Sequence, residues 1–259
     1  MKPKPPDTNH AARGKTERPQ TDVRTALLET ALTQIPRSRT LADEAYEQLR
    51  HSLISGQLRP GQAITVRGVA AALNISLTPA REAIGRLYTE GVLAEGPNRT
   101  VSVPRLTRSA YLELMTIRLA LEPLAAGKAV SNLSMADLSA LHALQDGVRE
   151  AYEERDFKLV LRCNENFHFH LYRKSRMPAL VQMIEGLWLR IGPTLTFLHE
   201  SAPAGATWPG DINHREILAA VASRDGDRLG EAVRKDLVAG AERLLAILDN
   251  DDATGVEKR

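Results

Sequence analysis

The stretch that decides the fold is residues 65–86, TVRGVAAALNISLTPAREAIGR. Apolar residues recur at helical spacing in its first half, and Asn74 then offers a residue that tolerates the left-handed backbone needed to leave a helix. Ser76 or Thr78 can cap a second helix through a hydroxyl, and Pro79 fits its first turn, because the amide there is unpaired in any case. The stretch therefore predicts two short helices joined by a sharp turn, a helix-turn-helix.

The second helix of this pair is amphipathic, with Arg81 and Arg86 directed outward. A purely structural helical hairpin has the same pattern, so the flanking segments decide between the two interpretations. Upstream, residues 41–64 predict one amphipathic helix that ends at Gly56. Downstream, residues 92–94 and 100–103 predict two short strands joined by a turn that carries Arg99. A helix, a helix-turn-helix and a β-hairpin in this order make a winged helix.

At these residues the chain resembles the DNA-binding domain of the GntR family of bacterial transcription regulators. The residues that carry the resemblance are Leu58, Pro60, Gly61, Arg67, Ala70, Ser76, Thr78, Pro79, Arg81, Glu82, Ala83, Leu87, Glu90 and Gly91. The resemblance implies that double-stranded DNA is contacted by Arg67, Ser76, Leu77, Thr78, Pro79, Arg81 and Arg99. The family usually has Arg where this chain has Leu77. Since Leu makes only apolar contact with a base, for example with a thymine methyl, the usual base preference is not expected here.

Composition and charge fit a two-domain, mainly helical protein. The 259 residues are 43% apolar with few aromatic residues, and the net charge of +2 is unevenly distributed. Residues 1–105 hold 15 Lys and Arg against 10 Asp and Glu, whereas residues 106–259 hold 19 against 22. This charge asymmetry fits a DNA-binding head on a neutral-to-acidic body.

The single cysteine, Cys163, excludes an intrachain disulfide, and no apolar run reaches the length of a membrane span. The polar N-terminus also lacks the apolar segment of a signal peptide, so we expect a cytoplasmic protein without a membrane partner. Residues 1–38 are rich in Pro, Lys and Arg and predict a disordered basic extension, with a helix between 22 and 34. An alternative is a basic arm that lies along DNA phosphates.

Residues 39–105 are assigned to the winged helix-turn-helix domain and residues 106–250 to an all-α antiparallel bundle of six to seven helices, with a disordered tail at 251–259. The apolar periodicity predicts bundle helices over residues 108–130, 134–152, 156–174, 178–199, 211–222 and 225–248. The fourth of these is expected to kink at Gly192-Pro193, because proline removes a helix hydrogen bond.

The bundle contains a candidate site. Asn164 and His168 are four residues apart and therefore share one face of the third bundle helix, whereas His170 points away from that face. His214 lies on the fifth bundle helix and Asp236 on the sixth. No organic cofactor is expected.

The bundle resembles the C-terminal effector-binding domain of the FadR-type subgroup of GntR regulators, the FCD domain. Arg118-x-x-x-Glu122, Phe167-His168 and the spacing from His214 to position 236 carry the resemblance. Many members bind a divalent metal through an Asp and three His, and the metal often helps to bind a small carboxylate effector. Asn164 stands at the Asp position and Asp236 at the last His position. The resemblance implies Asn164, His168, His214 and Asp236 as metal ligands, and two imidazoles with two oxygen ligands suit Zn²⁺, Ni²⁺ or Mn²⁺. Arg118, on a helix that lines the same cavity, is a candidate to pair with a carboxylate effector or to form a helix-surface salt bridge, and Arg190 is a further effector-binding candidate.

Three alternatives remain open at this point. His168 and His214 can hydrogen-bond an effector directly, without a metal. The bundle can serve only to form a homodimer. A metal-dependent hydrolase would need a general base, for which Glu165 or Glu216 are candidates, but the chain has no HExxH spacing, phosphate loop or nucleophile elbow, so we do not expect an enzyme. The sequence therefore predicts a homodimeric repressor that binds a pseudo-palindromic operator under the control of a small organic acid.

Overall fold

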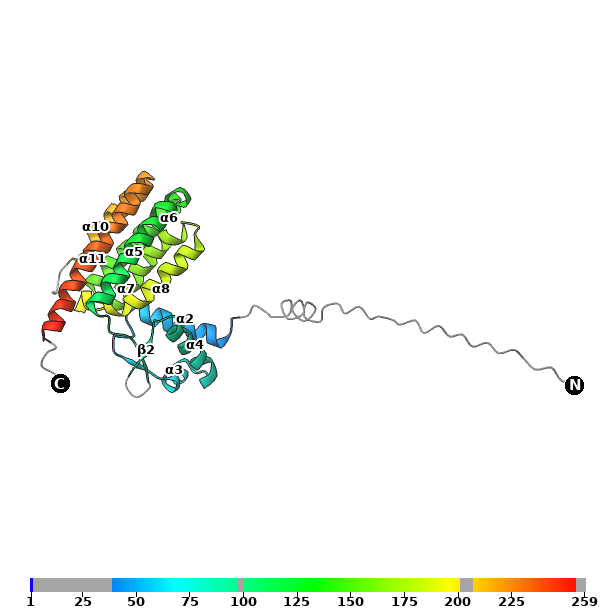
Figure 1. Ribbon diagram of the computed structural model, residues 1–259. Helices are drawn as coiled ribbons and strands as arrows, with labels where there is room; N and C mark the ends of the chain where they lie inside the picture. Colours follow the sequence, from blue (N-terminus) through cyan, green and yellow to red (C-terminus); the bar gives the residue numbers. More distant parts are fainter. Residues whose placement is uncertain (2–38, 97–99, 201–206, 255–259) are drawn as a thin grey trace. The chain divides into compact units, whose positions relative to one another are not determined.

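The computed structural model describes residues 1, 39–96, 100–200 and 207–254 (Figure 1). Its contacts divide the chain into Met1–Arg39 and one compact unit, Thr40–Arg259. The predicted disordered extension falls, apart from Met1, outside the described residues. No helix in the described part of the chain is both long enough and apolar enough to cross a membrane.

The N-terminal part of the compact unit is a winged helix-turn-helix. Its elements are α2 (Leu41–Ile54), β1 (Ala63–Ile64), α3 (Val66–Leu73), α4 (Leu77–Thr89), β2 (Ala94–Glu95) and β3 (Val101–Ser102). The three strands form an antiparallel sheet in the order β1-β3-β2, with Ser102 opposite both Ala63 and Ala94. The sequence did not predict β1, because two residues are too short to show the alternation of a strand. Tertiary pairing with β3 defines it.

Local chemistry sets the ends of these helices. Thr40 and Asp43 form a capping box at the start of α2, and Thr65 Oγ1 accepts a hydrogen bond from Gly68 N at the start of α3. Asn74 adopts the predicted left-handed conformation, with φ 52°. Ser76 occupies the N-cap position of α4, but its side chain makes no capping hydrogen bond. The sharp turn between α3 and α4 therefore depends on Asn74 more than on a hydroxyl cap.

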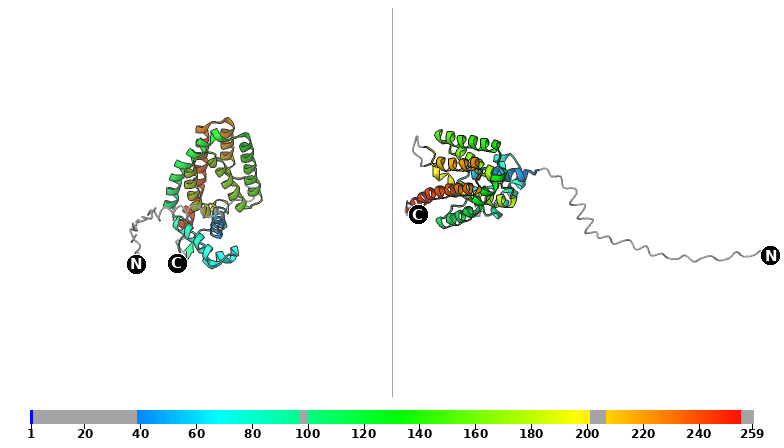
Figure 2. Two further views of the ribbon diagram at one scale, coloured as in Figure 1. Left: turned by 90° about the vertical axis from the view of Figure 1, so that its right-hand side faces the viewer. Right: turned by 90° about the horizontal axis from the view of Figure 1, so that it is seen from above.

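The C-terminal part is the expected helical bundle, with two additional short elements. Its elements are α5 (Arg108–Ala129), the 3-10 helix η2 (Val130–Asn132), α6 (Met135–Glu153), α7 (Phe157–Arg173), α8 (Pro178–Leu195), α9 (Phe197–Glu200), α10 (Asp211–Ser223) and α11 (Gly226–Thr254). Helix α11 packs along α5 and α6 packs along α7, as the views in Figures 1 and 2 show. The interruption expected at Gly192-Pro193 falls at Thr196, between α8 and α9. Helix α11 continues to Thr254, past the expected boundary at residue 250.

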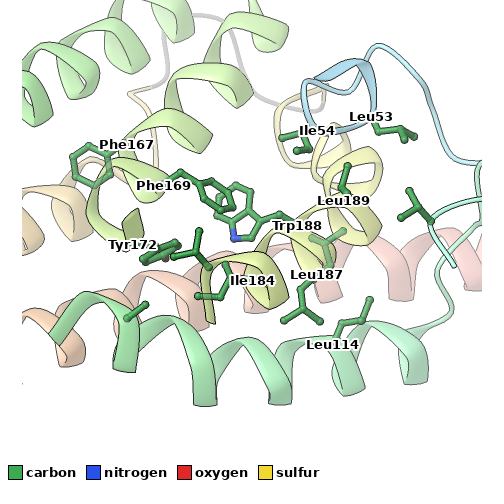
Figure 3. Packing of buried hydrophobic residues seen from close by; sticks show 14 of the residues in the cluster. Leu53, Ile54, Leu114, Phe167, Phe169, Tyr172, Ile184, Leu187, Trp188 and Leu189 are labelled. Atoms are coloured by element: carbon green, nitrogen blue, oxygen red, sulfur yellow. The ribbon is translucent and has the colours of Figure 1, made fainter. Parts of the chain in front are cut away.

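One hydrophobic core joins the two parts. Figure 3 shows side chains of α7 and α8 packed together at its centre, with Leu114 of α5 below them and Leu53 and Ile54 of α2 beside them. All of these side chains are buried. Because α2 belongs to the winged helix and α8 to the bundle, α8 is an element through which the bundle supports the winged helix.

Helix α8 lies close to the backbone of α2 at Gly192. A Cβ built on Gly192 would lie 2.9 Å from Ile54 Cα and 3.2 Å from Leu53 O, which are backbone atoms that cannot rotate away. Gly186 lies on the same helix, and a Cβ there would meet nothing within 4 Å. Alanine at Gly186 therefore changes helix propensity alone, whereas alanine at Gly192 changes helix propensity and also introduces a steric clash.

We predict opposite effects of the two alanine substitutions on thermal stability. Gly186→Ala should raise the free energy of unfolding by up to about 1 kcal/mol, because alanine favours the helix. Gly192→Ala should lower it despite the same gain in propensity, because the methyl group pushes α8 away from α2. Thermal denaturation of both variants beside the wild type measures this. A stabilised Gly192→Ala would show that the close approach of α8 to α2 is not required.

Candidate functional site

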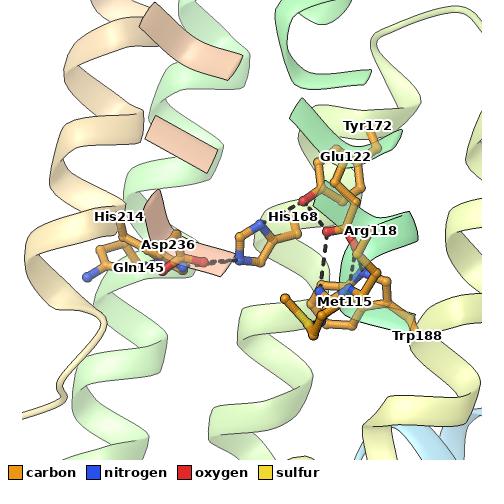
Figure 4. Close-up of polar contacts among 9 residues, drawn as sticks. All are labelled: Met115, Arg118, Glu122, Gln145, His168, Tyr172, Trp188, His214 and Asp236. Atoms are coloured by element: carbon orange, nitrogen blue, oxygen red, sulfur yellow. Dashed lines mark hydrogen bonds and ion pairs between the residues drawn. The ribbon is translucent and has the colours of Figure 1, made fainter. Parts of the chain in front are cut away.

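Three potential metal ligands from three helices converge in the bundle. The ligand atoms of His168 (α7), His214 (α10) and Asp236 (α11) all lie within 4.8 Å of one another. His168 Nε2 is 3.3 Å from His214 Nε2 and 3.3 Å from Asp236 Oδ2 (Figure 4). Both histidines are buried. The sequence proposed these three residues together, and the tertiary structure brings them into one cluster.

A hydrogen-bond chain fixes which nitrogen of His214 carries its proton. Asp211 can only accept, so the Gln145 amide nitrogen donates to Asp211 Oδ1 at 2.7 Å and Gln145 Oε1 faces His214. His214 Nδ1 therefore donates to Gln145 Oε1, at 2.6 Å. Burial is the main reason that the pKa of His214 falls from 6.5 to about 3, so this imidazole is neutral near pH 7. Its Nε2 then presents a lone pair to His168 and Asp236.

A second chain orients His168. The Tyr172 hydroxyl has one proton, which it donates to Glu122 Oε2 at 2.7 Å. The same hydroxyl oxygen lies 3.2 Å from His168 Nδ1, so that nitrogen carries the proton and donates to Tyr172. Glu122 is fully buried and also accepts from Trp188 Nε1 at 3.2 Å and from Arg118 Nη2 at 3.3 Å. This chain leaves a lone pair on His168 Nε2 as well.

The two chains make the cluster a site for a cation. Two nitrogen lone pairs and a carboxylate oxygen that face one another repel unless a positive charge lies among them. A proton on His168 Nε2, shared with Asp236, is one such charge, and a metal ion is the other. Imidazole nitrogen and carboxylate oxygen are common ligands of divalent transition metals, and neutral histidines are the form that binds metal. The residues present therefore fit a metal.

The charge of Asp236 is preserved despite its position. Burial acts to raise the pKa of this carboxyl group, but in the metal-free cluster the hydrogen bond from a proton on His168 Nε2, together with the charge of Arg243, outweighs burial. The pKa of Asp236 therefore lies below its ordinary value. An ionised carboxylate is the form that binds a metal.

A cavity of about 70 Å³ adjoins the cluster. Asn164, His168 and Asp236 line it, and Asn164 is one turn before His168 on α7, as the spacing predicted. The two tryptophans of the chain, Trp188 and Trp208, also line it. Three of the four predicted ligands therefore face the cavity, whereas His214 lies behind them and is not among the lining residues.

The structure separates the two predicted effector arginines. Arg118 lines the cavity, but it is buried and its guanidinium pairs with Glu122 through two nitrogens. Burial opposes its charge, but Glu122 outweighs burial and raises the pKa of Arg118. Arg190 is absent from the lining residues, and its Nη2 donates to the carbonyl oxygen of Glu90, at the end of α4, at 3.0 Å. Arg190 contacts the winged helix instead.

The predicted DNA-contacting side chains lie on the outer face of the helix-turn-helix. Those described as exposed are Arg67, Ser76, Leu77, Thr78 and Arg81, and Pro79 is half-buried. Leu77 has 45% of its surface exposed, which is large for an apolar side chain at the start of a helix. Arg86 differs from Arg81 because it pairs with Asp43 at 2.7 Å and lies 3.9 Å over the Tyr46 ring. Arg99 lies outside the described residues.

Several residues of the site were not found from the sequence. Gln145 and Tyr172 orient the two histidines, but nothing in the local pattern of α6 or α7 distinguishes them from other helix residues. Glu122 carried a partial signal, since it is four residues after Arg118 and the pair shares a helix face. Trp188 could have been suspected only as a large buried residue.

Comparisons with known proteins match both parts of the chain. The family of bacterial regulatory proteins named gntR matches residues 41–103, and the FCD domain matches residues 113–239. The HTH-type transcriptional regulator McbR of Escherichia coli strain K12 is 33% identical over 186 residues, which are 72% of this chain and 84% of McbR. The HTH-type transcriptional repressor RspR of the same strain is 24% identical, over 80% of this chain and 90% of RspR.

A solved structure of E. coli McbR/YncC shares the fold, with a TM-score of 0.74 and 31% identity over 83% of this chain and 99% of that one. The helix-turn-helix, the three-stranded sheet and the helical bundle thus occur together in a known regulator. The relatives named above are transcription regulators rather than enzymes. The chain belongs to the GntR family of bacterial transcription regulators, in the group with a C-terminal FCD domain, and is a DNA-binding transcription regulator.

Proposed function

We propose that this regulator is a homodimeric repressor whose operator affinity is set by a small carboxylate bound with a divalent metal in the bundle. The observation that carries the proposal is the convergence of His168, His214 and Asp236 beside a cavity. A cluster of lone pairs costs stability unless a cation satisfies it. Such a cluster is expected in a bundle that binds a ligand and not in one that only dimerises.

The two winged helices of the dimer read two half-sites of a pseudo-palindromic operator. Arg81, Thr78 and Leu77 face the major groove, and Arg67 and Arg99 bind phosphate or the adjacent groove. The exposure of Leu77 supports its role in an apolar base contact, because an exposed leucine gains by being covered. That RspR is named a repressor supports repression here.

In the bundle, His168, His214, Asp236 and Asn164 hold the metal, which is Zn²⁺, Ni²⁺ or Mn²⁺. When bound, the metal would supply a positive charge that attracts the carboxylate of the effector. Gln145 and Tyr172 keep the two Nε2 lone pairs directed at it. A ligand changes operator affinity only as far as it prefers one dimer geometry over the other.

A direct test of the regulator is the fluorescence anisotropy of labelled DNA from the chain's own upstream region, against a scrambled duplex, over a salt series. We expect binding that prefers the native fragment and that weakens steeply as salt rises, because phosphate contacts release counterions. Addition of metal and carboxylate should then shift the affinity. Tight operator binding that no metal and no carboxylate changes would favour a bundle that only dimerises.

Arg81→Ala should weaken specific DNA binding by about 1–3 kcal/mol, because a bidentate contact with a base edge is lost. The matched control is Arg86→Ala, an arginine on the same helix whose charge is engaged with Asp43. The control should keep the discrimination between operator and scrambled DNA. Equal discrimination by Arg81→Ala and the wild type would remove Arg81 from base recognition.

The double variant His168→Ala, His214→Ala should lose metal binding in isothermal titration with Zn²⁺, Ni²⁺ and Mn²⁺, since two of the ligand atoms are gone. DNA binding without ligand should persist, because both residues lie in the bundle and their described polar contacts are with other bundle residues. The control is His170→Ala on the same helix as His168, where the imidazole contacts Asp137 instead of the cluster. Unchanged metal stoichiometry in the double variant would place the metal elsewhere.

A further inference from the structure

Two arginines line the cavity beside the metal cluster, Arg118 of α5 and Arg243 of α11. A carboxylate ligand needs a cation that has no carboxylate partner already. In a bidentate ion pair, the partner carboxylate compensates the charge of the guanidinium and occupies two of its N–H groups. The contacts of the two arginines therefore decide which one meets the ligand.

Arg118 is committed to Glu122. Its Nε and Nη2 both donate to that carboxylate, and its guanidinium lies 4.8 Å from the Trp188 ring centre. Only 5% of Arg118 is exposed, and Glu122 has no exposed surface. Withdrawing Arg118 from Glu122 toward a ligand would leave a buried carboxylate short of its charge partner, which is costly. Arg118 thus forms part of the wall.

Arg243, in contrast, has no such carboxylate partner among the described residues. Its Nε donates to the carbonyl oxygen of Ala239 in its own helix, at 3.1 Å, and no carboxylate in the described part of the chain forms an ion pair with it. Arg243 follows Asp236 by seven residues, which is two helical turns, so both side chains lie on one face of α11. Its two Nη groups are available on the same side as the metal cluster.

A glycine between Asp236 and Arg243 leaves the cavity between these two side chains open. Gly240 lines the cavity, and a Cβ built there would meet only Arg243 Nη2, at 4.0 Å. A glycine in a helix interior costs about 1 kcal/mol relative to alanine, so its presence is consistent with a requirement for space. The cavity of about 70 Å³ has room for roughly five water-sized groups, which limits the ligand to a compact molecule.

We propose that Arg243, rather than Arg118, pairs with the carboxylate of the effector, and that the effector is a compact carboxylate bound between Arg243 and the metal cluster. This inference rests on the proposed function of the bundle. It assigns the specificity for a negatively charged ligand to α11, the same helix that supplies Asp236. The planar fork of Arg243 matches the two oxygens of a carboxylate.

The test uses the fluorescence of the two tryptophans, since both line the cavity and report ligand binding without DNA. The Zn²⁺-loaded full-length chain is titrated with acetate, lactate and malonate, and with the neutral analogue malonamide. We expect saturable binding of at least one carboxylate by the wild type and none of malonamide. Arg243→Met should weaken that binding by roughly 10- to 100-fold, and Arg243→Lys by less, because lysine keeps the charge and loses the fork.

Two further variants separate charge from packing. Gly240→Ala leaves every charge in place and favours the helix, so its expected loss of carboxylate affinity reports the occupied space alone. Arg234→Met, on the exposed side of α11, should bind like the wild type. Zinc titration of each variant shows whether the metal site is intact.

The outcomes distinguish the inference from the function beneath it. Equal carboxylate affinity of Arg243→Met and the wild type, with zinc binding unchanged, would overturn the role of Arg243 and leave the metal-dependent regulator standing. Failure of the zinc-loaded wild type to bind any of the three carboxylates would overturn the carboxylate effector itself, and with it this inference.

Discussion

The rest of the site depends on Glu122, a carboxylate with no exposed surface. A buried charge is tolerated only if it is paired and hydrogen-bonded, and here the donors come from three helices: Arg118 on α5, Tyr172 on α7 and Trp188 on α8. Satisfying this one group fixes how the three helices pack around it. The same network determines the protonation of His168, because the proton of Tyr172 is used by Glu122 and His168 must supply its own. The orientation of a candidate metal ligand thus follows from the hydrogen-bond demand of a residue that is not itself a ligand.

Helix α8 links this network to the DNA-binding part. Trp188 lies against His168, with ring centres 5.5 Å apart, and it donates to Glu122. One turn further along the same helix, Gly192 touches the backbone of α2 and Arg190 bonds the carbonyl oxygen of Glu90 at the end of α4. A helix that contacts both parts within one turn is the kind of element that carries a packing change between two sites. In this chain such a change would reach α2 and the end of the recognition helix.

The contrast between Arg118 and Arg243 shows why residue type alone is a poor guide to a ligand contact. Both are arginines that line one cavity. Arg118 fits the pattern of an effector-binding residue in sequence, yet its guanidinium is paired with the buried carboxylate of Glu122. Arg243 lay in a helix that showed only amphipathic periodicity, and nothing near it in sequence indicated that its guanidinium would face the cavity. Which charges pair depends on how the helices of the bundle pack, and the spacing of residues along one helix does not predict it.

The sequence by itself determined the winged helix-turn-helix, the helical bundle and the set His168, His214 and Asp236. The helices and the turn depend on short-range features, namely apolar periodicity, Asn74 at the turn and the i, i+4 spacing of Asn164 and His168. His214 and Asp236 were assigned as ligands through the resemblance to the FCD domain. The tertiary structure alone decided strand β1, the hydrogen-bond partners Gln145 and Tyr172, and the placement of Arg190 against Glu90 rather than in the cavity. Each of these depends on a contact between residues that are far apart in sequence, and such contacts exist only once the helices have packed.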